Sequence, residues 1–192
     1  MELLLLAINA MLIGNLILSK FLGICPFLGV SRRLSTALGM SMAVLFVMVL
    51  ASTVTWTLFY TLLRPLHLEY LRTILFILVI ASLVQLVEMV MQKLSPALYE
   101  ALGIYLPLIT TNCAILGVAI DSIDKGYDFL HMIVYAFFGA VGFALALLLF
   151  AGIRERLETA DMPKSFQGAA SSLIVAGILS LAFMGFSGLV PG

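Results

Sequence analysis

Charged residues are scarce in this sequence. They make up 10% of the 192 residues, with ten basic and ten acidic side chains, whereas soluble domains average roughly 25%. A soluble fold of this length could not bury the 63% of residues that are hydrophobic, because chain length limits the share of surface that folding removes from water. The composition therefore indicates an integral membrane protein, and the balanced charge offers no basic patch for nucleic acid.

Cysteine is also rare, and the motifs of soluble enzymes are missing. The two cysteines, Cys25 and Cys113, lie in apolar surroundings, which argues against the disulfide framework of a small secreted protein. The sequence contains neither a Gly-rich phosphate loop nor a dinucleotide-binding fingerprint. These absences exclude a water-soluble catalytic domain.

Long apolar runs are what the sequence has in abundance. A helix needs about 20 apolar residues to cross the ~30 Å hydrocarbon core of a bilayer. The connections between the runs are too short to form a further domain, so we predict one all-α membrane domain over residues 1–192. The six predicted spans are Leu3 to about Gly23 with an irregular continuation to Val30, Leu34–Leu63, Leu71–Met91, Leu102–Ile120, Phe129–Ile153 and Ala169–Val190.

Basic residues are distributed unevenly between the two sides of this arrangement. Cytoplasmic loops of membrane proteins carry an excess of lysine and arginine, and the first, third and fifth connections hold seven of the ten. We therefore expect these connections to be cytoplasmic and both termini to face outward, with Asp121, Asp124 and Asp128 in a solvated outer loop. The seven residues are Lys20, Arg32, Arg33, Lys93, Arg154, Arg156 and Lys164.

A short motif occurs twice. Cys-x-x-Leu-Gly-Val begins at Cys25 and again at Cys113, which indicates an internal repeat with halves of about 1–91 and 92–192. Each half has three predicted helices. Because three is odd, the second half enters the membrane from the opposite side. This is an inverted-repeat architecture, in which functional sites gather near the midplane at interrupted helices.

The first cysteine lies beside a predicted helix interruption. Gly23 and Pro26 flank Cys25, and proline removes a backbone donor and disfavours helix at the residue before it. To bring Cys25 to the same depth as the second cysteine, we expect an extended or bent link from Pro26 to Ser31.

The second cysteine follows a polar run within a short apolar span. Thr110, Thr111 and Asn112 come directly before Cys113, and polar side chains at that depth are costly unless they face protein or a cavity. Counting helical rise from the span ends places Cys113 roughly 12–16 Å from either end. We therefore predict that the fourth helix, like the first, is interrupted near the bilayer centre.

Two thiols at the midplane indicate a soft metal site. Thiolates suit iron–sulfur clusters, copper(I) or zinc, and a two-iron cluster usually takes four cysteines. A second chain of similar design could supply the missing two. Two alternatives remain open at this point: buried cysteines often act as small hydrophobic residues, and this pair could form a disulfide.

Longer stretches around these cysteines carry a resemblance to a known family. They resemble the signature segments of the RnfA/NqrE family of membrane subunits, found in the bacterial Rnf electron-transport complex and the sodium-pumping NADH:quinone oxidoreductase. The resemblance covers essentially the whole chain. The matching stretches are Leu22–Ser31, Leu106–Val118, Gly152–Leu157 and Ser180–Leu189.

The resemblance implies a role in an ion-translocating ferredoxin:NAD oxidoreductase of the bacterial inner membrane, coupled to Na⁺ or H⁺. It implies a [2Fe–2S] cluster at the membrane centre, with Cys25 and Cys113 as two ligands and two more from a homologous, inverted subunit of the RnfE type. The flavins (FMN) and the nucleotide site would belong to other subunits of the B, C, D and G types. This chain alone would catalyse nothing.

Residues around the two ligands are candidates for supporting roles. Pro26, Thr110, Thr111 and Asn112 would surround the cluster. Lys20 would raise the potential of an anionic cluster, or it would simply extend to the cytoplasmic surface. Glu88, an acid near the inner end of the third span, is a candidate for the ion path or for an interface with a neighbouring subunit.

Two other classes of function compete with the redox interpretation. A secondary transporter or channel on the same inverted repeat would need substrate-coordinating polar groups at both interruptions, and the first offers only Cys25. A cofactor-free scaffold would tolerate replacement of both cysteines.

Overall fold

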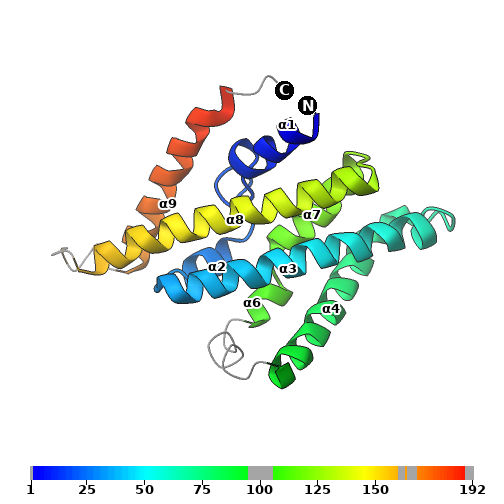
Figure 1. The fold of residues 1–192 in the computed structure, drawn as a ribbon, viewed down its shortest axis with the longest axis horizontal. Coiled ribbons are helices and arrows are strands. Elements are labelled where there is room, and N and C mark those ends of the chain that lie inside the picture. Colours follow the sequence, from blue (N-terminus) through cyan, green and yellow to red (C-terminus); the bar gives the residue numbers. More distant parts are fainter. Residues whose placement is uncertain (1, 95–105, 160–162, 164–167, 189–192) are drawn as a thin grey trace.

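The protein is helical throughout the part that the structure describes. The computed structural model describes residues 2–94, 106–159, 163 and 168–188, and every regular element within these ranges is a helix (Figure 1). The prediction of an all-α fold is confirmed. In chain order the elements are α1 (Glu2–Ile8), the π-helical turn η1 (Asn9–Ile13), α2 (Ile24–Gly29), α3 (Leu34–Leu58), η2 (Phe59–Leu63), η3 (Glu69–Leu71), α4 (Arg72–Leu94), α6 (Leu106–Thr110), α7 (Cys113–Asp124), α8 (Phe129–Glu158), α9 (Ala169–Met184) and η5 (Gly185–Gly188).

Within the described residues, three helices are long and apolar enough to cross a membrane, over Leu34–Leu63, Glu69–Val90 and Phe129–Glu158. They correspond to the second, third and fifth predicted spans, although the last continues five residues past Ile153. Shorter apolar helices cover Leu3–Ile13 and Ala169–Met184. The count of six passes and the inverted topology stay predictions.

Two predicted spans extend beyond the described residues. The fourth is split into α6 and α7 by two non-helical residues, Thr111 and Asn112, which confirms the interruption expected before Cys113. Its first residues, 102–105, lie outside the described residues. In the sixth span, α9 ends at Met184 and η5 follows, and residues 189–190 lie outside the described residues.

The first predicted span is wrong in its extent, because the helix that starts at Glu2 ends at Ile13 rather than near Gly23. The Asn15 side chain ends it. Its Oδ1 accepts from the backbone N–H groups of Ile17 and Leu18, at 3.1 and 3.3 Å. Asparagine competes with helical hydrogen bonding in this way. The segment from residue 14 to residue 23 is therefore folded but lacks regular helix.

The expected extended or bent link from Pro26 to Ser31 is wrong over residues 26–29, and the chain bends only from Val30 onward. Residues 24–29 form helix α2, with Pro26 as its third residue. Proline is tolerated there because the first turn of a helix has no intrahelical partners for its N–H groups. The interruption therefore lies before Cys25, as it does before Cys113.

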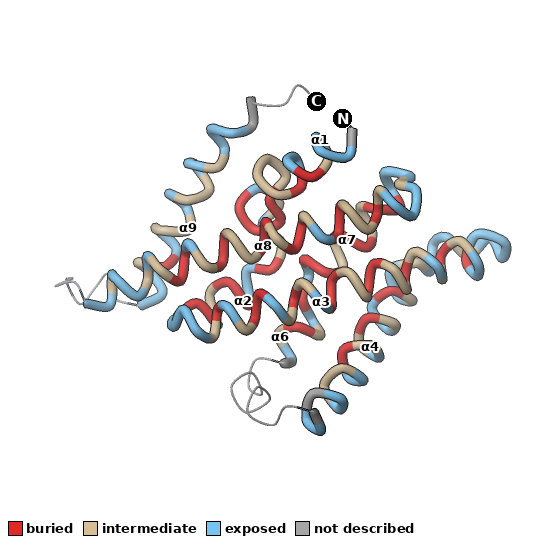
Figure 2. The backbone as a smooth tube through the Cα atoms, in the orientation of Figure 1, coloured by how far each residue is buried: buried red, intermediate tan, exposed pale blue. Residues whose placement is uncertain are grey.

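An antiparallel pair of long helices, α3 and α8, forms the centre of the fold (Figure 1). Their facing sides are buried, and helix α7 packs against both (Figure 2). Phe150 of α8 stacks on Phe27 of α2 with ring centroids 4.1 Å apart. In contrast, α4 and α9 lie at the periphery. Helix α4 buries Phe76, Ile80 and Val84 and exposes other apolar side chains, whereas Ser172 is the one buried residue among those described in α9.

Glycines in α8 let the interrupted first segment approach closely. A Cβ at Gly142 would lie 2.6 Å from the Met11 carbonyl oxygen, and one at Gly139 would lie 3.6 Å from Leu16. The carbonyl of Gly142 accepts a hydrogen bond from Asn15 Nδ2 at 2.8 Å. Small residues thus bring the non-helical segment against α8, where its polar groups find partners.

Candidate functional site

The two interrupted segments meet beside the second cysteine. The backbone N–H of Gly23 donates to Cys113 Sγ at 3.0 Å. Gly23 has φ of +81°, and a Cβ on it would lie 2.7 Å from Phe143 and 3.2 Å from Asn112 Oδ1. The left-handed conformation and the close packing both require glycine here. Since Gly23 is two residues before Cys25, the fold brings the two cysteine segments together.

The glycines of the two motif copies occupy corresponding places in the fold. A Cβ at Gly117 would lie 2.5 Å from Leu22, which is three residues before Cys25. A Cβ at Gly29 would lie 3.6 Å from Leu108, which is five residues before Cys113. Each glycine therefore faces a leucine from the segment that precedes the other cysteine, and the two copies of the motif hold each other in place.

Cys113 is the first residue of α7, and its sulfur accepts a hydrogen bond from the Gly23 N–H. The N-cap residue Asn112 accepts a hydrogen bond on Oδ1 from the Ala114 N–H at 3.0 Å. The positive end of the helix dipole and the Gly23 N–H donor both stabilise negative charge on this sulfur. The Asn112 side chain is buried, at 4% exposure, and its Nδ2 has no hydrogen-bond partner among the described residues.

Both cysteines are exposed on this chain and both are free. The alternative that they are buried small hydrophobic residues is therefore wrong for the chain by itself, and neither is in a disulfide. Within the described part of the chain, no three His, Cys, Asp or Glu side chains gather as a metal site. A metal cluster at this position would need further ligands from outside the described residues.

The other predicted neighbours of the cysteines have local roles. Pro26 is buried in α2. Thr111 is exposed and donates from Oγ1 to the Pro107 carbonyl at 2.9 Å, and Thr110 is half-buried in the last turn of α6. Thr110, Thr111 and Asn112 therefore lie together at the interruption before Cys113, as the sequence predicts.

Lys20 occupies a different place from the one expected. Its ammonium group forms an ion pair with Asp121 and lies 3.4 Å from the Tyr135 hydroxyl, which itself donates to Asp121 at 3.0 Å. The sequence puts Lys20 and Asp121 on opposite sides of the membrane, and this pairing corrects that assignment. With Lys20 on the same side as Asp121, six basic residues remain on the predicted cytoplasmic side and four lie on the outer side. Lys164, one of the six, lies outside the described residues.

A second lysine completes this polar cluster. Lys125 lies over the Tyr135 ring, 4.7 Å from its centroid, and together with Lys20 and Tyr127 it lines a small cavity of about 130 Å³. Burial lowers the pKa of Lys125, Lys20 lowers it further, and Asp121 acts in the opposite direction. Burial and then the Asp121 charge raise the pKa of Tyr127. Asp121 thus pairs with Lys20 and ties the segment before Cys25 to α7.

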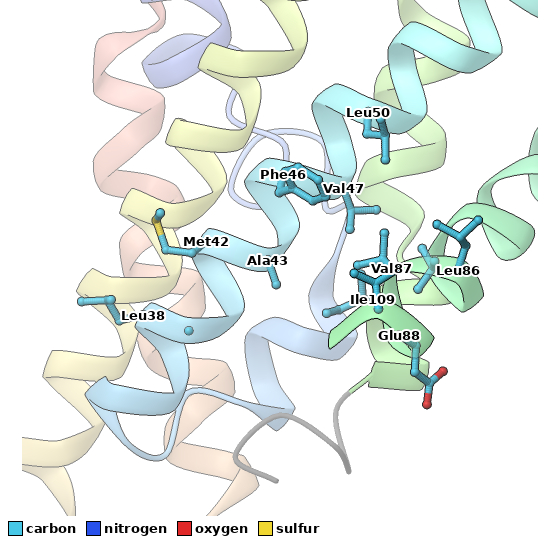
Figure 3. Close-up of a pocket in the computed structure, with 13 residues that line it drawn as sticks. Leu38, Met42, Ala43, Phe46, Val47, Leu50, Leu86, Val87, Glu88 and Ile109 are labelled. Carbon is cyan, nitrogen blue, oxygen red and sulfur yellow. The ribbon is translucent and has the colours of Figure 1, made fainter. Parts of the chain in front are cut away.

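Glu88 is not part of the cysteine site. It accepts a hydrogen bond from Gln85 Nε2 at 3.2 Å. It lies at the edge of an apolar groove of about 630 Å³ between α3 and α4, which Ile109 also lines. Its carboxylate points away from the apolar side chains of the groove (Figure 3). A role for Glu88 in ion passage stays a prediction.

Sequence reasoning missed Asn15 and Tyr135, which organise the two ends of the interrupted first segment. Asn15 carried a usable signal, because it follows Gly14 inside an apolar run where a polar side chain needs a partner. Tyr135 carried none, since a tyrosine near a membrane interface is common.

The whole chain matches one family of membrane proteins. The family described as "Rnf-Nqr subunit, membrane protein" covers residues 3–190. The chain belongs to the Rnf-Nqr family. Both cysteine segments, Lys20 and Asp121 all lie within the matched residues, so the site described above is part of the Rnf-Nqr domain.

Several Rnf-Nqr relatives are similar over their full length. A protein of Syntrophotalea carbinolica, named as the A component of an ion-translocating oxidoreductase complex, is 63% identical, covering 100% of this chain and 99% of the relative. One of Acetobacterium woodii, named as the A component of a Na⁺-translocating ferredoxin:NAD⁺ oxidoreductase complex, is 56% identical over 100% of both chains. A third, from Serratia proteamaculans, carries the same name as the first and is 58% identical over 98% of both.

Proposed function

We propose that this chain is the A-type membrane component of an ion-translocating ferredoxin:NAD oxidoreductase complex. The full-length similarity to relatives with such names supports this assignment, as does membership of the Rnf-Nqr family. On this proposal the chain takes part in electron transport and ion transport within a larger membrane complex and has no catalytic activity alone.

The single observation that carries a redox role is the approach of the two cysteine segments, marked by the Gly23 N–H donor on Cys113 Sγ. We infer that Cys25 and Cys113 are two of the four ligands of a [2Fe–2S] cluster. The donor set fits, because thiolates are the usual ligands of such clusters and both cysteines are free and exposed. When bound, the cluster supplies one-electron transfer at a point within the membrane.

The protein itself would hold and insulate this group. Gly23 donates to the Cys113 sulfur, Asn112 caps the helix that carries it, and Phe143 closes the apolar side of the Gly23 loop. Exposure of both cysteines leaves room for a partner to supply the other two ligands. A homologous subunit of the RnfE type in inverted orientation would present its own pair, and subunits of the B, C, D and G types would carry flavins (FMN) and further centres.

The membrane arrangement follows the same proposal. The chain would cross the bacterial inner membrane several times with both termini on the outer side, and electron transfer would be coupled to translocation of Na⁺ or H⁺. The distribution of basic residues supports this sidedness. They are more numerous at the end of the molecule where Arg154 donates to the Leu28 carbonyl and to Ser31, each at 2.7 Å.

Low-temperature electron paramagnetic resonance on the purified complex tests this proposal. We expect a two-iron signal that persists when the soluble iron–sulfur subunits are removed and disappears in Cys113→Ser and in Cys25→Ser. Electron transfer from ferredoxin to NAD should fall to background in both variants, because serine is a poor ligand for this cluster type.

The spectrum also separates the alternatives. A cofactor-free scaffold and a transporter both predict that the spectrum is the same in the two serine variants and the parent complex, and that result would reject the redox assignment. A variant complex that retains all subunits on size-exclusion chromatography excludes failed assembly as the cause of a lost signal.

A further inference from the structure

The Asn112 side chain contains a buried donor without an acceptor. The residue is 4% exposed, and Nδ2 has no hydrogen-bond partner among the described residues. Buried polar groups in proteins are nearly always paired, so an unpaired one needs an explanation. Asn112 directly precedes Cys113, so this donor belongs to the interruption that carries the second candidate ligand.

The orientation of this amide is fixed by the helix that it caps. Oδ1 accepts from the Ala114 N–H at 3.0 Å, and a flipped amide would bring Nδ2–H against that N–H instead. The same Oδ1 would lie 3.2 Å from a Cβ on Gly23. The acceptor end of the side chain is therefore occupied, and the NH₂ group is on the other branch. Because an NH₂ group donates and does not accept, it cannot coordinate a cation.

The neighbouring groups indicate what would accept from it. The Gly23 N–H already donates to Cys113 Sγ at 3.0 Å, so this corner of the site presents donors to sulfur. The start of α7 adds the positive end of a 12-residue helix. The Asn112 amide donor, the Gly23 N–H and the start of α7 all favour an anionic, sulfur-rich group over a cation or an apolar side chain.

We infer, on the basis of the proposed function, that the Asn112 side-chain amide donates a hydrogen bond to a sulfur of the cluster held by Cys113. Asn112 is then a positioning residue that raises the reduction potential of the cluster, because hydrogen bonds to the sulfurs stabilise the more negative reduced state. The Gly23 N–H acts in the same direction from the other half of the chain.

Pulsed electron paramagnetic resonance of the reduced complex, prepared with asparagine labelled by ¹⁵N at the side-chain amide, tests this inference. The labelled positions in this chain are Asn9, Asn15 and Asn112. We expect a ¹⁵N hyperfine coupling to the cluster in the parent complex and its loss in Asn112→Ser, a change that keeps a capping oxygen. If the parent complex shows no such coupling, the inference is overturned without any need for a variant.

Redox titration of the same signal supplies a second readout. We expect a lower midpoint potential in Asn112→Ser and in Asn112→Asp, which keeps the size and the capping oxygen but removes the donor. Ser122→Ala is the matched control, because Ser122 is a buried polar residue of the same helix whose hydroxyl donates to the Ala119 carbonyl at 2.9 Å. The midpoint potential of the Ser122→Ala complex should equal that of the parent complex.

The outcomes distinguish this inference from the proposed function. A two-iron signal that depends on Cys113 but has the same potential in Asn112→Ser as in the parent overturns the inference and leaves the function intact. A complex without any Cys113-dependent signal overturns the function itself.

Discussion

At the scale of single residues, the site depends on one backbone contact to the Cys113 sulfur. Cys113 has a helix start behind it and one backbone donor, the Gly23 N–H, in front of it. That donor is available only because Gly23 adopts a left-handed conformation and lacks a side chain that would meet Phe143. A glycine that the sequence marks only as a helix breaker thus supplies the contact between the two halves.

Replacement of Gly23 by alanine should destabilise the complex and, on the proposed function, weaken the two-iron signal. The left-handed conformation costs a residue with a Cβ about 1–2 kcal/mol, and the added methyl group would also lie 2.7 Å from Phe143. Gly126→Ala is the matched control, because Gly126 also has a positive φ, +63°, but has nothing within 4 Å of its Cβ position. Thermal unfolding of the detergent-solubilised complex measures the stability of both variants. Equal losses of stability would show that packing at Gly23 contributes nothing.

At the scale of helices, each cysteine segment is held by an element from the other half or from the centre of the fold. Leu22 packs into the space left by Gly117, and Leu108 packs over Gly29. The polar segment that precedes Cys25 lies against α8, and the Lys20–Asp121 pair joins it to α7. The interrupted helices are therefore held by contacts at several points along their length. Such contacts fix the positions of the site residues.

Close approach of the first segment to α8 should make Gly142 intolerant of substitution. In Gly142→Ala the new Cβ would lie 2.6 Å from the Met11 carbonyl oxygen, a backbone atom that cannot rotate away. Overpacking of this kind costs about 1–3 kcal/mol, so we expect a lower unfolding temperature and a weaker Asn15–Gly142 contact.

Gly152→Ala provides the control for that change within the same helix. A Cβ at Gly152 has nothing within 4 Å, and alanine is the better helix former by about 1 kcal/mol. Its unfolding temperature should stay the same or rise. A stable Gly142→Ala protein with an unchanged cluster spectrum would contradict the close packing described here.

At the scale of the whole molecule, the chain has the surface of one part of a complex rather than that of a complete protein. The peripheral helices α4 and α9 expose apolar side chains, and both cysteines are exposed as well. Lipid can cover the apolar surface, whereas the proposed cluster would need ligands from a partner protein. The two ends of the molecule also differ in their polar contacts. Arg154 donates to the Ser31 hydroxyl at one end, and Arg72 forms an ion pair with Asp124 at the other.

Sidedness follows from these two ends and can be measured directly. We expect a cysteine introduced by Lys125→Cys to react with a membrane-impermeant maleimide from the outer side, and one introduced by Arg33→Cys to react only from the cytoplasmic side. Both positions are exposed, and the end around Arg33 holds more basic residues. The parent chain, with only its two native cysteines, measures background labelling. Reaction of the two positions from the same side, or with the sides exchanged, would refute the topology.

Much of the fold could be predicted because membrane spans depend on composition within short windows. The helix over Leu34–Leu63 has the predicted bounds, and the interruption before Cys113 follows from Thr110, Thr111 and Asn112. The first segment could not be predicted in the same way. Its helix ends at Ile13, where the Asn15 side chain accepts from Ile17 and Leu18 and donates to the carbonyl of Gly142, 127 residues away.

The sequence by itself determined that this is an all-helical membrane protein with a repeated cysteine motif, because hydrophobicity and motif spacing can be read without knowing which residues touch. The tertiary structure alone decided that Gly23 donates to Cys113, that Lys20 pairs with Asp121, and that each motif glycine receives a leucine from the opposite segment. These contacts join residues about 80–100 positions apart, and no local preference specifies them. They depend on the packing of both cysteine segments against α8 and against each other.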